Sequence, residues 1–176
     1  MTPQQSNMSE PETLRFGYGD TPLGLIMVAE SAHGVVALFM GDDRTKLGLE
    51  LREAFPEAHL LRDDAGLAKT IAKAVALIEA PHLGTDLPLD LRGSPIEVAV
   101  WGALRAVPPG ETRTYGAIAR DLPITATAQE VGAACAANKI AVAIPCHRVV
   151  KSDGSIAGYR WGVRRKRRLI NIEGVA

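Results

Sequence analysis

Residues 140–150 read IAVAIPCHRVV, and this stretch decides how the rest of the chain is interpreted. Its apolar first half is typical of a buried strand that runs into Pro145. Cys146, His147 and Arg148 follow directly. We expect the proline to fix the backbone at the end of this strand and to hold the cysteine in an accessible position. The stretch therefore predicts a reactive thiol on rigid backbone.

A lone cysteine is more often a small buried hydrophobic residue than a nucleophile. The neighbours of Cys146 favour the nucleophile, because His147 and Arg148 are cationic groups that lower a thiol's pKa. Adjacent residues on an extended chain point to opposite faces, so a water-bridged contact between Cys146 and His147 is an alternative to a direct one. This adjacency also argues against a cysteine protease, whose histidine usually lies far along the chain.

Glu173 is the candidate to orient His147. It follows Leu169 by four residues and Ile170 by three, so it falls on the apolar stripe of a C-terminal helix. A buried carboxylate needs a partner. Any arginine would serve, whereas pairing with His147 would complete a nucleophile, a base and an orienting group.

The segment before the cysteine is expected to form helices. Residues 94–97 (SPIE) are a capping box with proline at the first helical position. Thr114 can cap a short second helix, and Thr127 with Glu130 can cap a third after a turn. Small side chains at 131–137 would let this third helix approach another helix or a DNA groove closely. In a helix-turn-helix the first turn of the second helix, here from Thr127, contacts DNA.

The first half of the chain looks structural, with nothing in residues 1–90 that indicates chemistry. We expect its histidines, His33, His59 and His82, to lie at the surface in or beside turns. Residues 1–11 read as a disordered lead and 81–93 as a linker. The predicted strands are 13–18, 23–29 and 34–39, and the predicted helices run from Asp42 or Asp43 to Phe55 and over 67–80.

Composition and charge narrow the function classes. With 47% hydrophobic and 23% charged residues in 176, the chain is expected to be globular and not disordered. It has no apolar run long enough for a membrane span, and its start lacks the features of a signal peptide. Two cysteines and four scattered histidines predict a reducing, cytoplasmic location, no disulfide scaffold, no metal and no cofactor.

The two halves of the chain carry opposite charge. Residues 1–93 hold eight basic and fourteen acidic side chains, and residues 94–176 hold twelve and six. The second half is thus expected to face a polyanion. Its densest basic run, residues 164–168, would either contact DNA phosphates or form a solvated helix face.

Several motifs together resemble one family, the O6-alkylguanine-DNA alkyltransferases. They are PCHRV at 145–149, VPPGET at 107–112, AAN at 136–138 and GYRWG at 158–162. The resemblance covers residues 12–175 and is greatest to the catalytic half of the bacterial adaptive-response alkyltransferases. Those proteins also carry a zinc-bearing regulatory lobe, for which this sequence has no clustered cysteines.

This resemblance implies an α/β N-terminal lobe of ribonuclease-H type over 12–90 and a mainly helical lobe over 94–176. A helix-turn-helix of the second lobe would enter the minor groove of double-stranded DNA. The protein, expected to be a monomer, would flip out O6-alkylguanine and transfer the alkyl group irreversibly to its cysteine, once per molecule.

Site residues carry over by matching position. Cys146 would be the alkyl acceptor, His147 the base acting through water and Glu173 its orienting group. Asn138 would brace the turn beside the site. Tyr115 would contact the flipped base or its phosphate, and it is the candidate donor of a proton to the leaving guanine. The residues expected to bind substrate or DNA are Tyr159, which would wall the pocket, Val149 and Ser155, whose backbone would read the guanine edge, Thr127, Arg148 and Gln129.

Gln129 departs from the family, which usually has an intercalating arginine at this position. Glutamine is neutral and shorter, so it cannot stack a guanidinium plane in the gap left by the flipped base. Either flipping is merely weaker, or the protein repairs duplex DNA poorly or prefers another DNA context. The alternative function is therefore a lesion-recognising DNA-binding protein with weak or no alkyl transfer.

Overall fold

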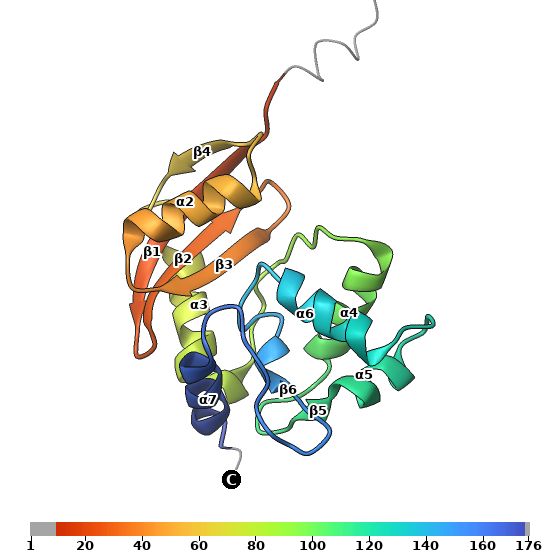
Figure 1. Cartoon of the computed structure of the whole chain (residues 1–176). Helices are drawn as coiled ribbons and strands as arrows, with labels where there is room; N and C mark the ends of the chain where they lie inside the picture. Colours follow the sequence, from red (N-terminus) through yellow and green to blue (C-terminus); the bar gives the residue numbers. More distant parts are fainter. Residues whose placement is uncertain (1–9, 175–176) are drawn as a thin grey trace, which may run out of the picture.

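A computed structural model describes residues 10–174, and part of the predicted disordered lead lies outside this range. Three strands follow one another as antiparallel hairpins: β1 (Thr13–Thr21), β2 (Gly24–Glu30) and β3 (Val35–Gly41). These match the three predicted strands. A fourth strand, β4 (His59–Arg62), pairs in parallel with β1 and gives the sheet order β3-β2-β1-β4 (Figure 1).

The sequence analysis missed β4, and it placed His59 in or beside a turn. This histidine is exposed, as predicted, but it lies in the edge strand. The segment HLLR is short and largely exposed, so it lacks the alternation of apolar and polar residues that marks a half-buried strand.

Two helices cover the sheet, α2 (Arg44–Ala54) in front and α3 (Ala68–Glu79) behind in Figure 1. Asp43 caps α2 by accepting hydrogen bonds from two backbone N–H groups of its first turn. Helix α3 lies very close to β1: a Cβ at Gly19 would come within 2.7 Å of the Ile71 side chain. Glycine at this position therefore allows the close packing.

The second half contains α4 (Pro95–Arg105), α5 (Tyr115–Asp121), α6 (Ala128–Ala137) and α7 (Val163–Ile172). The predicted caps at Ser94–Glu97, Thr114 and Thr127–Glu130 are all present. The short strands β5 (Arg113–Thr114) and β6 (Val149–Val150) pair in parallel. Helix α7 returns to pack against α3 of the first half (Figure 1).

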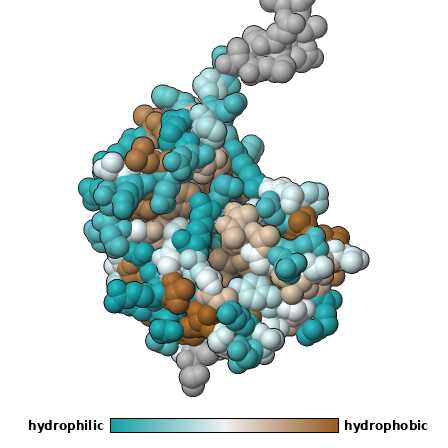
Figure 2. Space-filling view, viewed as in Figure 1, coloured by the Kyte–Doolittle hydropathy of each residue, from teal (hydrophilic) through white to brown (hydrophobic). Residues whose placement is uncertain are grey.

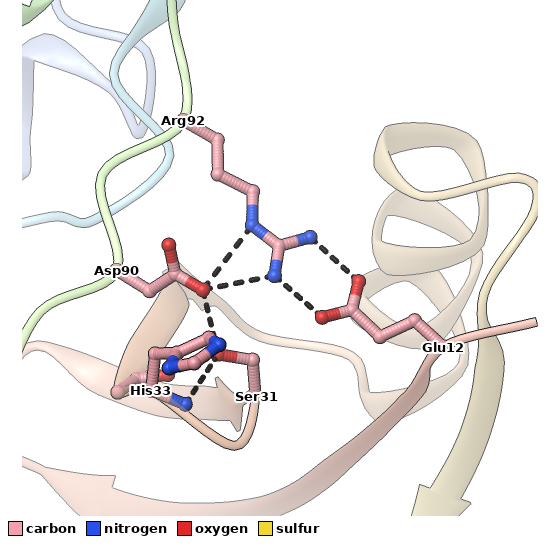
Figure 3. A network of polar contacts seen from close by, with 6 residues as sticks. Glu12, Ser31, His33, Asp90 and Arg92 are labelled. Carbon is pink, nitrogen blue, oxygen red and sulfur yellow. Dashed lines mark hydrogen bonds and ion pairs between the residues drawn. The ribbon is translucent and has the colours of Figure 1, made fainter.

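The predicted linker is tied to the sheet. It begins with the short helix η1 (Pro81–Leu83). Figure 3 shows Arg92 between two carboxylates, with Nη1 2.7 Å from Glu12 Oε1 and Nη2 2.8 Å from Asp90 Oδ2. Ser31 Oγ donates to the same Asp90 oxygen at 2.6 Å. These contacts join the start of β1, the β2–β3 turn and the linker.

The strand predicted before the cysteine is wrong. Residues 140–144 form no strand; isolated backbone contacts attach this segment to the edge of the sheet instead. Leu38 N of β3 donates to Lys139 O at 2.9 Å, and Ala141 N donates to Leu38 O at 2.9 Å. After residue 141 the chain leaves the edge of the sheet through two tight turns.

The buried hydrophobic residues form one cluster that extends from the sheet into the helices of the second half. The segment around Cys146 therefore packs against the same hydrophobic core as the sheet. No helix between residues 10 and 174 is long and apolar enough to cross a membrane.

Candidate active site

Cys146 lies in the wall of a cavity of about 480 Å³. The other lining residues are Tyr115 of α5, Gly132, Cys135 and Ala136 of α6, and residues 158–160. The cysteine is only 4% exposed, so a reagent must enter the cavity to reach the sulfur. The exposed residues of α6 are three alanines together with Gln129 and Glu130. Figure 2 shows a light-brown, weakly hydrophobic area near the middle of this face of the molecule, with hydrophilic residues around it.

Two consecutive tight turns set the position of Cys146. Ala143 N donates to Ala141 O at 2.7 Å around Val142, whose φ is 68°. Cys146 N donates to Ile144 O at 2.8 Å around Pro145, whose φ of −81° and ψ of 62° are those of an inverse γ-turn. A β-branched residue at positive φ is strained. The site thus maintains a backbone that the local sequence does not favour.

Cys146 itself begins a 3-10 helical turn, η2 (Cys146–Arg148). The expected extended geometry, with adjacent side chains on opposite faces, does not apply to this segment. Pro145 does hold the backbone, but through a turn and not at the end of a strand. The cysteine is also buried, not accessible as predicted.

Asn138, the residue that ends α6, braces these turns. Its Nδ2 donates to Ile144 O at 3.0 Å and to Cys146 Sγ at 3.4 Å, while its Oδ1 accepts from Ile140 N at 2.8 Å. The side chain is fully buried. One amide therefore connects the helix end, the turn and the sulfur.

Glu173 binds both partners that the sequence left open. Its Oε2 lies 2.8 Å from His147 Nε2 and accepts from Arg148 Nη2 at 2.7 Å, and its Oε1 accepts from Arg148 Nε at 2.9 Å. The carboxylate is 2% exposed. With Nε2 protonated and bonded to the carboxylate, His147 Nδ1 is the ring's acceptor, and it has no partner within residues 10–174.

Arg148 is not placed to contact DNA, contrary to the prediction. The side chain is buried, and all its nitrogens are engaged, since Nη1 donates to Val107 O at 2.6 Å and the other two donate to Glu173. A guanidinium paired with a buried carboxylate stabilises the charge of that carboxylate. Arg148 therefore supports the His147–Glu173 pair from behind.

The electrostatics follow from these contacts. Burial would raise the pKa of Glu173, but hydrogen bonds from His147 and Arg148 outweigh it and lower this pKa to about 2. Burial lowers the pKa of His147, against the opposing effect of Glu173. At neutral pH the pair is therefore a carboxylate beside a neutral imidazole, which is the form that can accept a proton.

The thiol does not behave as the sequence predicted. Burial raises the pKa of Cys146, and the groups that lower it are Asn138, Lys166 and Arg160. His147 and Arg148 do not, because both are committed to Glu173. The prediction that the positive charge of the two adjacent residues lowers the pKa of the thiol is wrong for this reason.

Two tyrosines line the cavity with the sulfur. Burial raises the pKa of Tyr115 to about 12, so its hydroxyl stays protonated. Tyr159 stands edge-on to His147, with ring centroids 6.5 Å apart, and its buried hydroxyl has no partner among the described residues. Burial raises the pKa of Tyr159 well above its ordinary value.

The remaining predicted residues are not among those that line this cavity. Val149 is buried in β6, whereas Ser155 is exposed in the following loop and bonds Asp153. Thr127 caps α6, and Gln129 is exposed in its first turn. No three His, Cys, Asp or Glu side chains within residues 10–174 are grouped so as to hold a metal ion.

Sequence reasoning missed two further residues that line the cavity and one buried lysine. Cys135 of α6 lines the cavity together with Cys146. Arg160 Nη1 donates to Asn138 O at 2.9 Å, and its guanidinium lies 5.0 Å from the Phe39 ring centroid. Lys166 was hidden in the basic run. Arg160 is part of the GYRWG motif, which is the one signal that could have identified it.

Comparison with known proteins decides the family. The methylated-DNA–protein-cysteine methyltransferase of Mycobacterium tuberculosis H37Rv is 46% identical over 155 residues, which is 88% of each chain. This chain belongs to the methylated-DNA–protein-cysteine methyltransferases. A sequence model described as "6-O-methylguanine DNA methyltransferase, DNA binding domain" matches residues 95–175 of this methyltransferase family member.

A longer relative and a solved structure agree. The Escherichia coli K12 bifunctional transcriptional activator/DNA repair enzyme Ada is 41% identical over 160 residues, 91% of this chain. The chain spans only 45% of the length of that relative. The crystal structure of M. tuberculosis OGT in complex with DNA has a TM-score of 0.76 at 31% identity and covers 90% of this chain and 92% of its own. This chain thus has the fold of that solved structure, a mixed sheet covered by helices with a second, mainly helical half.

Proposed function

We propose that this chain repairs DNA by direct reversal, moving the alkyl group of O6-alkylguanine irreversibly to Cys146. The observation that carries the proposal is a thiol in the wall of a cavity, beside a buried His147–Glu173 pair whose imidazole keeps a free acceptor nitrogen. Membership of the methyltransferase family supports it.

In the proposed step Cys146 Sγ attacks the alkyl carbon. The S–C bond forms, the C–O6 bond breaks, and the electron pair goes to O6 of the leaving guanine. The thiol proton passes through water to His147 Nδ1, and the guanine gains a proton from Tyr115 or from water. A thiolate suits this soft carbon, and protonation makes guanine a better leaving group.

The same proposal assigns roles to the helices and residues around Cys146. Helices α5 and α6 would form a helix-turn-helix that enters the minor groove of double-stranded DNA, with Thr127 and Gln129 at the contacting end. The backbone of Val149 and Ser155 would read the guanine edge, with Tyr159 as a wall. The small exposed face of α6 supports close approach to DNA.

We also propose a domain organisation, an oligomeric state and a location for this chain. Residues 12–90 would be a ribonuclease-H-like lobe, and residues 94–176 the lobe that binds DNA and accepts the alkyl group. We expect a monomer. A cytoplasmic location is inferred from the two cysteines, since thiol chemistry of this kind requires a reducing compartment.

The test is intact mass after incubation with a duplex that carries O6-methylguanine, with Cys146→Ser as the control. We expect the wild-type chain to gain the mass of one methylene group, mapped to the peptide of Cys146 and not to that of Cys135. The control should gain nothing. A wild-type chain that binds the lesion but gains no mass would contradict alkyl transfer.

That last outcome would favour the second candidate, a lesion-recognising DNA-binding protein. The observation behind it is Gln129, which is exposed in the first turn of α6 and is neutral. Glu130 beside it is held by the capping box and adds a negative charge at the same end. Glutamine fills the gap left by a flipped base less well than an arginine, so a protein with Gln129 at this position would bind the lesion without efficient alkyl transfer.

A further inference from the structure

Arg165 of α7 joins three segments that lie far apart in the sequence. Its Nε donates to Leu23 O at 2.9 Å, its Nη1 donates to Trp161 O at 3.1 Å, and its Nη2 lies 2.8 Å from Asp42 Oδ1. Leu23 lies in the turn between β1 and β2, and Asp42 directly follows β3. One guanidinium therefore connects two loops of the first half to the residue that ends the GYRW segment before α7.

This connection reaches the wall of the active-site cavity through Trp161. Residues 158–160 line the cavity with Cys146, and Trp161 follows them directly. The indole stands edge-on to Tyr159, with ring centroids 5.3 Å apart, and it packs on Phe39 of β3 at 6.5 Å. It is 5% exposed. The position of Trp161 therefore helps to set that of Tyr159 in the cavity wall.

Open space borders the guanidinium on two sides. Surface cavities of about 470 Å³ and 540 Å³ are both lined by Asp42, Trp161 and Arg165. Without the guanidinium, the Trp161 carbonyl would lose its bond to the side chain, and water from these cavities would take its place. The loop would then be free of its tie to the turn between β1 and β2.

The geometry of the guanidinium suits a clamp better than a single ion pair. The pair with Asp42 alone contributes little, because the carboxylate side chain is 85% exposed. The two carbonyl acceptors add to it, since a guanidinium presents its N–H groups in a planar, rigid fork. The Arg165 side chain is 19% exposed, whereas Arg164, Arg167 and Arg168 are exposed on the same helix. Arg165 thus faces the rest of the chain, and its neighbours in the basic run face solvent.

We propose that Arg165 clamps the loop 158–161 to the first half and so fixes one wall of the active-site cavity. This inference rests on the proposed function, in which the cavity receives the alkylated guanine. A reactant misplaced by about 1 Å loses a factor of about 100 in rate, so a loosened wall slows alkyl transfer. Arg165 acts through Trp161 and Tyr159 and is therefore a positioning residue. The first half, which the sequence presents as structural, then takes part in shaping the site.

The first test follows hydrogen exchange of the Gly162 amide by NMR, in the full chain and without DNA. This amide donates to Tyr159 O at 3.0 Å and reports opening of the loop. We expect Arg165→Met to speed its exchange about tenfold while the amides of α4 keep their rates, as local opening would. Arg164→Met, an exposed change on the same helix, is the matched control. Arg165→Lys keeps the charge but lacks the fork, so it should restore little of the protection.

The second test measures single-turnover methyl transfer against the concentration of a duplex that carries O6-methylguanine. We expect Arg165→Met to lower the limiting rate about tenfold and to keep the duplex affinity and its salt dependence. An unchanged limiting rate would overturn the proposal, and weaker duplex binding alongside it would assign Arg165 to a phosphate contact. Asp42→Ala, at an exposed position, covers a Met variant that does not fold, and it should change both readouts in the same direction by less.

The exchange data separate this inference from the repair function. Unchanged exchange at Gly162 in whichever of the Met and Ala variants folds, or full protection in Arg165→Lys, would overturn the proposal. Methyl transfer by the wild type together with unchanged exchange would refute this inference alone. Faster exchange in Arg165→Met, with no methyl transfer by the wild type, would refute the repair function alone.

Discussion

Replacing Glu173 by glutamine should cost the protein a large part of its stability. The carboxylate accepts three hydrogen bonds, at 2.7–2.9 Å, from His147 and from the buried guanidinium of Arg148. Glutamine keeps the shape but removes the charge, so the guanidinium is left unpaired in the core. Breaking a buried ion pair in this way typically costs about 3–5 kcal/mol.

The pH dependence of the free energy of unfolding gives a second, independent value for the contribution of Glu173. The pKa of Glu173 falls from its usual 4.5 to about 2 in the folded chain. At roughly 1.4 kcal/mol per unit, this corresponds to about 3 kcal/mol. Because the folded value is the lower one, the stabilisation is fully present above pH 4.5 and is lost as the pH falls through about 2.

The assay is urea denaturation of wild type and Glu173→Gln at neutral pH and near pH 3. We expect a gap of about 3 kcal/mol at neutral pH that shrinks to roughly half near pH 3. Glu111→Gln is the matched control, because Glu111 pairs with Arg113 at the surface and should change stability by less than about 1 kcal/mol. A neutral-pH gap below that size, or one that does not shrink in acid, would refute the reasoning.

Three further changes test other parts of the molecule. Gln129→Arg should speed repair of duplex substrate in a single-turnover assay, and an unchanged or lower rate would show that this position does not limit flipping. Asn138→Ala should destabilise the fold by about 1–3 kcal/mol in thermal unfolding, because it leaves Ile140 N unpaired and removes one of the two donors to Ile144 O. Arg92→Ala should cost about 1 kcal/mol, reduced at high salt, and a salt-independent loss would contradict its ionic origin.

Local signals predicted most of the secondary structure. The capping boxes at Ser94 and Thr127 and the cap at Thr114 depend on side chains within three residues, so the sequence reports them directly. The first three strands were found for the same reason, through their apolar runs between turn residues. Strand β4 was missed because its pairing with β1, and not its own composition, makes it a strand.

The chemistry of the site was only partly predictable. Glu173 was found by helical periodicity, and its pairing with His147 was one of two alternatives that turned out to coexist. The burial of Arg148 and Lys166 could not be predicted, because the sequence around a charged residue does not show whether the fold buries its side chain. The turn at Val142 was missed because a continuous apolar run carries no signal for a residue at positive φ.

The contact between Leu38 and the segment 139–141 has a consequence for the sheet itself. Strand β3 is an outer strand, and an outer strand with unpaired backbone groups is a template for aggregation. Here the chain that leads to Cys146 occupies part of that edge, and Val35 binds the linker at Pro88 and Asp90 along the rest. The segment that leads to Cys146 therefore also protects the outer edge of β3. A fragment that ends at the linker would leave the backbone groups of Leu38 unpaired on this edge, and we expect it to self-associate.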